Sequence, residues 1–133
     1  MSCAKDVMTT DVIVVREDTP VLEALELCVT HRISGIPVVD HQEYIVGMLS
    51  ERDMLKLHEA GHAMYEQTVS DYMTQPAIFF EEYESLWDIC ACFSQHYIRR
   101  VPITRSGKVV GIVSAKDVLH AIMLAAQTSS SVS

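Results

Sequence analysis

One seven-residue pattern occurs twice in this chain. It reads glycine, two apolar residues, serine, any residue, a basic residue and aspartate, and it begins at Gly47 and again at Gly111. Other blocks recur in the same order, each 65 residues apart: 6–9 with 71–74, His31 with His96, and 36–38 with 101–103. Ordered blocks at nearly one spacing indicate an internal repeat. The chain is therefore expected to fold as two similar halves that share one core.

The sequence of each half predicts the element order β-α-β-β-α. In the first half, Thr19 is the expected N-cap of a helix and Pro20 its first residue. Apolar runs and helical spacing predict strands at 12–15, 36–39 and 44–49 and a second helix over 51–59. In the second half the same signals predict strands at 77–80, 100–104 and 108–113, with helices from Ser85 and over 115–126. Gly107 suits the turn between the last two strands.

Composition restricts the class of protein. The 133 residues are 49% hydrophobic and 21% charged, as in a globular protein that forms a core. The net charge of −8 argues against general affinity for nucleic acid. No apolar run is long enough to span a membrane, and no signal peptide is predicted. We expect a cytoplasmic protein, because Cys28, Cys90 and Cys92 lie in helical patterns as buried thiols.

These features together resemble a known family, the tandem CBS-domain pair, or Bateman module. The resemblance is carried by Val7-Met8-Thr9, by the stretch 34–40, by the stretch 47–53 and by their second-half equivalents. It covers residues 4–126. Repeat 1 is expected at 4–60, a linker at 61–68, repeat 2 at 69–126 and a flexible tail at 127–133.

The resemblance implies an α/β (α+β) fold in which two β-α-β-β-α repeats pack sheet to sheet with pseudo-two-fold symmetry. It also implies a regulatory module and not an enzyme. Such modules commonly bind AMP, ADP or ATP in clefts between the repeats, and some bind S-adenosylmethionine or NAD-type ligands. We expect no separate cofactor, a homodimer, and action on a separate protein that the sequence does not identify.

Carried over residue by residue, the resemblance gives two candidate clefts, each with parts from both repeats. The favoured nucleotide-binding cleft contains Thr9, Val12, Ile33, Ser34, Arg99, Ile112, Ser114, Lys116 and Asp117. The second, weaker cleft contains Thr74, Ala77, Ile98, Met48, Ser50, Arg52 and Asp53.

Charge decides between the two clefts. Residues 1–65 have a net charge of −6 and residues 66–133 of −2, and five of the ten basic side chains lie between Arg99 and Lys116. Cations near a phosphate form charge-assisted hydrogen bonds. In the favoured cleft, Asp117 would accept hydrogen bonds from ribose hydroxyls, while Ser114 and the helix N-terminus hold phosphate.

Two other interpretations must be considered. His58-Glu59-Ala60-Gly61-His62 matches the H-E-x-x-H pattern of zinc proteases. Gly61 would break that helical face and no third ligand is apparent, so we expect no metal site. The second interpretation is a dimerisation scaffold with empty clefts, which would need neither Ser-x-x-Asp motif. Trp87 and Phe93 are expected in the core, while faces containing Leu86, Ile89, Phe93, Ile122 and Leu124 are candidates for a dimer interface.

Overall fold

The computed structural model describes residues 2–132 and divides them into two compact units. Unit 1 contains the chain up to Val12, Phe79–Ser106 and the chain from Val110 onward. Unit 2 contains Ile13–Ile78 and Gly107–Val109. Each unit is built on its own three-stranded sheet, so the predicted α/β class and doubled plan are confirmed.

Unit 2 contains a sheet of order β1-β2-β3, in which β1 runs parallel and β3 antiparallel to the central strand. Its elements are β1 (Val15–Arg16), α2 (Val21–His31), β2 (Gly35–Val39), β3 (Ile45–Ser50), α3 (Glu51–Met54) and the short 3₁₀ helices η1 (Leu55–Glu59), η2 (Gly61–Tyr65) and η3 (Val69–Asp71). Every residue of β2 is buried, as expected for a central strand covered on both faces.

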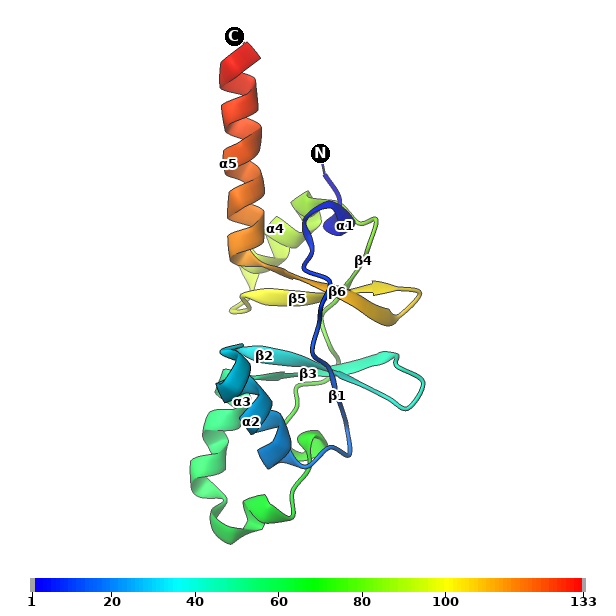
Figure 1. Cartoon of the computed structure of the whole chain (residues 1–133), viewed down its shortest axis with the longest axis vertical. Helices are drawn as coiled ribbons and strands as arrows, with labels where there is room; N and C mark the ends of the chain where they lie inside the picture. Colours follow the sequence, from blue (N-terminus) through cyan, green and yellow to red (C-terminus); the bar gives the residue numbers. More distant parts are fainter. Residues whose placement is uncertain (1, 133) are drawn as a thin grey trace. The chain divides into compact units, whose positions relative to one another are not determined.

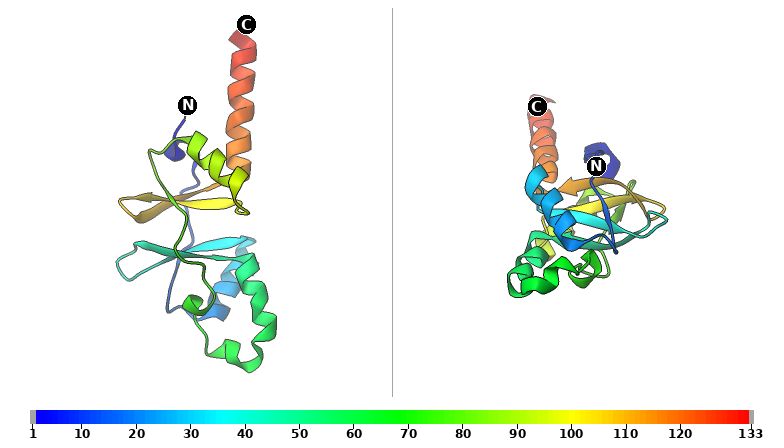
Figure 2. Two further views of the ribbon diagram at one scale, coloured as in Figure 1. Left: turned by 180° about the vertical axis from the view of Figure 1, so that it is seen from behind. Right: turned by 60° about the horizontal axis from the view of Figure 1, so that its bottom comes forward.

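Unit 1 repeats this plan with a sheet of order β4-β5-β6, in which β4 and β5 are parallel. Its elements are α1 (Ala4–Val7), β4 (Phe80–Glu81), α4 (Leu86–Gln95), β5 (Arg100–Arg105), β6 (Lys108–Ser114) and α5 (Ala115–Val132). The turn between β5 and β6 has positive φ at Ser106 and Gly107, the geometry of a two-residue hairpin. Figures 1 and 2 show α5 projecting beyond the other elements of unit 1.

The two compact units do not coincide with the two sequence repeats. Ala4, from the start of repeat 1, is fully buried in the core of unit 1 with residues of α4, β5 and β6. Val69, from the start of repeat 2, is fully buried in the core of unit 2. The two repeats thus exchange their leading segments. The prediction of one shared core is wrong, since the buried residues form two clusters, one in each unit.

Several predicted boundaries are also wrong. The first strand of each half is only two residues long, at Val15–Arg16 and Phe80–Glu81, because only these residues pair with a neighbouring strand. Thr19 does not cap α2, since its Oγ1 accepts a hydrogen bond from the Arg16 N–H at 3.0 Å. The predicted helix over 51–59 divides into α3 and η1.

The last helix is longer than predicted. It continues to Val132 instead of ending near residue 126, since alanine and glutamine at 125–127 are strong helix formers. The expected flexible tail is therefore helical at 127–132, and residue 133 lies outside the described residues. None of the four cysteines, all in the described range, forms a disulfide. Cys28 and Cys92 are buried, which raises the pKa of the Cys92 thiol, whereas Cys90 is half-buried.

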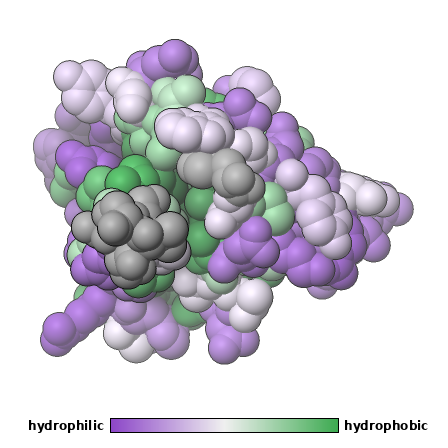
Figure 3. Space-filling view, turned by 90° about the horizontal axis from the view of Figure 1, so that it is seen from above, coloured by the Kyte–Doolittle hydropathy of each residue, from purple (hydrophilic) through white to green (hydrophobic). Residues whose placement is uncertain are grey.

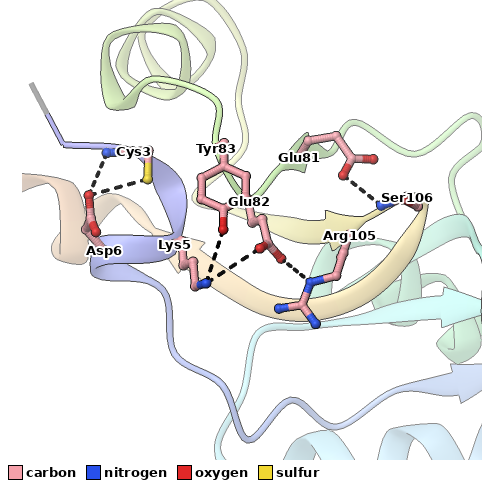
Figure 4. A network of polar contacts seen from close by, with 8 residues as sticks. All are labelled: Cys3, Lys5, Asp6, Glu81, Glu82, Tyr83, Arg105 and Ser106. Atoms are coloured by element: carbon pink, nitrogen blue, oxygen red, sulfur yellow. Dashed lines mark hydrogen bonds and ion pairs between the residues drawn. The ribbon is translucent and has the colours of Figure 1, made fainter.

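A polar network fastens α1 to the sheet of unit 1 (Figure 4). At its centre is Glu82, which is only 3% exposed. Its Oε2 accepts a hydrogen bond from Arg105 Nε at 2.8 Å, and its Oε1 lies 3.8 Å from Lys5 Nζ. Lys5 also donates to the Tyr83 hydroxyl, which is the main reason why the pKa of Lys5 is raised. The buried carboxylate of Glu82, which lies in the loop between β4 and α4, thus connects α1 with the end of β5.

Candidate functional site

In unit 1, the Ser-x-x-Asp motif closes the junction between β6 and α5. The Ser114 N–H and Oγ donate to Asp117 Oδ2 at 2.8 and 2.9 Å, and the Asp117 N–H donates back to Ser114 Oγ at 3.2 Å. This is a capping box, with aspartate in place of the usual glutamate. It engages only Oδ2, and the described residues provide no donor for Asp117 Oδ1. The half-buried carboxylate therefore keeps one oxygen available to accept further hydrogen bonds.

The leading segment of repeat 1 pairs with β6 beside this motif. Thr9 and Ile112 exchange two backbone hydrogen bonds, each of 2.9 Å. This pairing requires glycine at position 111, because a methyl group there would lie 2.5 Å from Met8 Sδ. Val12 follows three residues later and is half-buried. Unit 1 thus brings predicted residues from both ends of the chain to the start of α5.

Three basic residues lie close to the same helix start in the backbone. The Arg99 carbonyl accepts a 2.8 Å hydrogen bond from the Ala115 N–H, which ties the residue before β5 to the first turn of α5. The Arg99 and Lys116 side chains are exposed and form no ion pair with a described residue. Nε of neighbouring Arg100 is buried and has no hydrogen-bond partner within the described chain. Unused cationic donors at a helix N-terminus favour an anionic ligand.

Unit 2 builds the equivalent motif at the junction of β3 and α3. Ser50 and Asp53 form the same capping box, with hydrogen bonds of 2.9, 2.9 and 3.2 Å. Thr74 and Met48 exchange two backbone hydrogen bonds, and the Ser34 carbonyl accepts one from the Glu51 N–H. Here, however, the Thr74 hydroxyl also donates to Asp53, at 3.2 Å from Oδ1 and 3.3 Å from Oδ2.

The units divide the predicted site residues between them. Unit 1 contains Thr9, Val12, Arg99, Ile112, Ser114, Lys116 and Asp117, together with Ile98. Unit 2 contains Met48, Ser50, Arg52, Asp53, Thr74 and Ala77, together with Ile33 and Ser34. The contributions of Ile33 and Ser34 to the first cleft, and of Ile98 to the second, stay predictions. Two features could not be predicted from the sequence: Arg100 Nε, which has no partner among the described residues, and the Thr74–Asp53 bond, although the repeated Met-Thr pair marks the position of the threonine.

The H-E-x-x-H segment does not form one helical face. His58 lies in η1 and His62 in η2, and Gly61 between them has a positive φ of 58°. The described residues contain no group of three or more His, Cys, Asp or Glu side chains placed to hold a metal ion.

Removing both histidines should therefore have little effect. We expect the double variant His58→Ala/His62→Ala to change the free energy of unfolding by less than about 0.5 kcal/mol, as is usual for surface substitutions. Urea denaturation and metal analysis check this expectation. One tightly held zinc ion per chain, lost in the variant, would contradict it.

Comparison with known proteins gives consistent results. The family model for the CBS domain matches twice, at residues 4–59 and 69–124. The CBS domain-containing protein YhcV of Bacillus subtilis is 36% identical over 117 residues, which are 88% of this chain and 83% of that protein.

Two solved structures are similar over nearly their whole length. CBSX2 from Arabidopsis thaliana, in complex with AMP, is 29% identical with a TM-score of 0.81, over 93% of this chain and 98% of that one. The CBS domain pair of MJ0100, in complex with 5′-methylthioadenosine and S-adenosylmethionine, is 25% identical with a TM-score of 0.79, over 92% and 96%.

Proposed function

Because this chain belongs to the CBS domain family, we propose that it is a regulatory module that binds an adenosine nucleotide at the Ser114–Asp117 motif of unit 1. The observation that carries the proposal is that Asp117 Oδ1 accepts no hydrogen bond from a described residue, next to basic side chains that form no ion pair within the described chain. The adenosine ligands of CBSX2 and MJ0100 support the choice of nucleoside. A regulatory role, without catalysis, is part of the proposal.

Each part of a nucleotide has a chemical counterpart in this unit. Asp117 Oδ1 accepts hydrogen bonds from the ribose diol, for which a carboxylate is well suited. Arg99, Lys116 and the N-terminal turn of α5 attract the phosphate through charge-assisted hydrogen bonds. Val12 and Ile112 offer apolar surface to the base.

The charge of the site separates the candidate ligands. AMP, ADP and ATP bring the anion that Arg99 and Lys116 would bind. S-adenosylmethionine carries a positively charged sulfonium group and no phosphate, so the same cations favour it less. NAD-type ligands retain a pyrophosphate and remain the second choice. An empty scaffold would leave the exposed cations and the buried Arg100 Nε without a role.

A thermal-shift panel tests the proposal directly. AMP, ADP, ATP, NAD and S-adenosylmethionine are compared with GMP at millimolar concentration. A ligand at one hundred times its dissociation constant stabilises the folded state by about 2.7 kcal/mol. We expect at least one of AMP, ADP and ATP to raise the melting temperature more than GMP. If none of the adenosine ligands does so, the scaffold interpretation replaces this one.

We also propose that the chain forms a homodimer through exposed apolar residues of α4 and α5. Leu86 and Ile89 were predicted for this surface but are buried in the core of unit 1, and Phe93 is half-buried. The reason is that residues 86, 89 and 92 form the face of α4 that packs into this core. Trp87, predicted to be buried, lies one residue beside that stripe and is 66% exposed. On α5, apolar side chains are exposed at Leu119, Ile122, Met123 and Leu124. Figure 3 shows hydrophobic surface exposed among hydrophilic residues on the face seen from above.

Light scattering checks this second proposal. We expect twice the mass of one chain at micromolar concentration, and a shift toward the monomer when Ile122 and Leu124 are both changed to Glu. Thr30→Glu is the control, since Thr30 is an exposed polar residue of α2, outside the proposed interface. A monomeric wild-type protein would contradict the proposal.

We also propose that the module regulates a separate protein and that its location is cytoplasmic. Within the described chain, no helix combines the length and the apolar character needed to cross a lipid bilayer.

A further inference from the structure

The two Ser-x-x-Asp motifs are alike in sequence but differ in the hydrogen bonds of their carboxylates. Asp53 is 7% exposed, and both of its oxygens lie within hydrogen-bond distance of Thr74 Oγ1. Asp117 is half-buried and uses only Oδ2. Thr9 stands in unit 1 where Thr74 stands in unit 2, yet no hydrogen bond joins its side chain to Asp117 in the described structure. Among the described residues, a threonine hydroxyl thus reaches both carboxylate oxygens in unit 2 but neither one in unit 1.

The backbone holds Thr74 in this position. Its N–H and carbonyl both bond to Met48, at 2.9 and 3.1 Å. Gly47 permits this close approach, because a methyl group there would lie 2.9 Å from the Thr74 carbonyl oxygen. The hydroxyl is thus presented to Asp53 by a fixed segment, and a ribose diol would have to replace it to reach the carboxylate.

Other features of unit 2 also disfavour a nucleotide. The motif is followed by a single turn of α-helix, α3, where unit 1 has the 18-residue α5. Ser34 stands where unit 1 has Arg99. By sequence count, unit 2 carries five basic and eleven acidic residues, a net charge of −6, against −2 for unit 1. The second site therefore lacks a carboxylate oxygen without a side-chain contact, a long helix dipole and one of the cations.

We propose that the Thr74 hydroxyl closes the Asp53 motif to ligand, so that each chain binds one adenosine nucleotide, at Asp117. This inference rests on the proposed function, which it extends by naming the residue that sets the stoichiometry. Thr74 acts through Asp53 and is a positioning residue.

Titration calorimetry with AMP, and then ATP, tests the inference on the full chain. The wild type should bind one nucleotide. Thr74→Val keeps the shape of the side chain but removes the hydroxyl, and should bind two. The second nucleotide should bind more weakly than the first, because the other differences of unit 2 remain. Thr74→Ser keeps a hydroxyl and should bind one, as should Thr30→Val, an exposed threonine of α2 that serves as control. A purely structural role for Thr74 would not create a second binding event.

The outcomes separate this inference from the proposed function. If the wild type binds two nucleotides, or if the wild type and Thr74→Val each bind one, the role proposed for Thr74 is wrong. Neither result contradicts the proposed nucleotide site. Binding to Thr74→Val alone would support the role of Thr74 and overturn the Asp117 site. If neither protein binds, both proposals are wrong. Thr74→Ala, which also lacks the hydroxyl but is smaller, replaces the valine variant if that variant does not fold.

Discussion

Replacing Arg105 with alanine should lower the free energy of unfolding by about 3 kcal/mol. Glu82 is buried, and Arg105 Nε at 2.8 Å is its nearest cation, whereas Lys5 Nζ lies 3.8 Å away. Removing one partner of a buried ion pair costs about 3–5 kcal/mol when the remaining charge has no other partner. Here Lys5 still lies near Glu82 and compensates part of its charge. The Arg105 side chain is 62% exposed, so water can reach the carboxylate once it is removed, and we expect the lower end of that range.

Urea denaturation followed by circular dichroism measures this effect as a change in the midpoint at constant slope. Lys56→Ala removes an exposed basic residue of η1 and should have almost no effect. Changing Glu82 to Leu in the Arg105→Ala background removes the buried charge and should recover part of the loss. An Arg105→Ala variant as stable as the wild type would contradict this expectation.

The internal repeat was enough to predict the doubled architecture and the junctions that build the site. Ser114 marks the start of α5 and Ser50 the start of α3, since each side chain accepts a hydrogen bond from the aspartate N–H three residues later. The bounds of the first strands could not be predicted as well. All four residues at 12–15 are β-branched, but a strand forms only where a neighbouring strand pairs with it. Pairing limits β1 to Val15–Arg16.

No local sequence pattern predicted that the two repeats exchange their leading segments. Repeat 1 reads as one continuous stretch, yet Ala4 is buried with α4 and β6 while the rest of that repeat surrounds its own core. The glycines of the repeated motif were the available hint. Gly47 and Gly111 each allow close approach of a Met-Thr pair from the other repeat, and any side chain there would collide with it.

The difference between Asp53 and Asp117 also could not be predicted. Both motifs have a threonine at the equivalent upstream position, so the sequence is symmetric where the hydrogen bonds are not. What distinguishes them is the hydroxyl of Thr74, 21 residues from Asp53 in the chain. Spacing indicates which residues share a junction, but hydrogen-bond direction depends on side-chain conformation in the folded protein.

Replacing Asp117 with alanine should weaken the binding of AMP by roughly 10- to 150-fold. A hydrogen bond to a charged group contributes about 1.5–3 kcal/mol, which corresponds to that change in the dissociation constant. The substitution also removes the capping box at α5, which costs about 1 kcal/mol of stability. Asp117→Asn separates the two effects, because its amide oxygen still accepts from the Ser114 N–H but carries no charge for the ribose hydroxyls.

Titration calorimetry on folded variants gives the affinity, and Asp88→Ala is the matched control. Asp88 is an exposed acid in the first turn of α4 in the same unit, so it reproduces the change in net charge near a helix N-terminus without touching the proposed site. Its affinity for AMP should equal that of the wild type. If Asp117→Ala binds normally and Asp53→Ala does not bind, the nucleotide occupies unit 2, and the proposed closure of that motif by Thr74 is wrong as well.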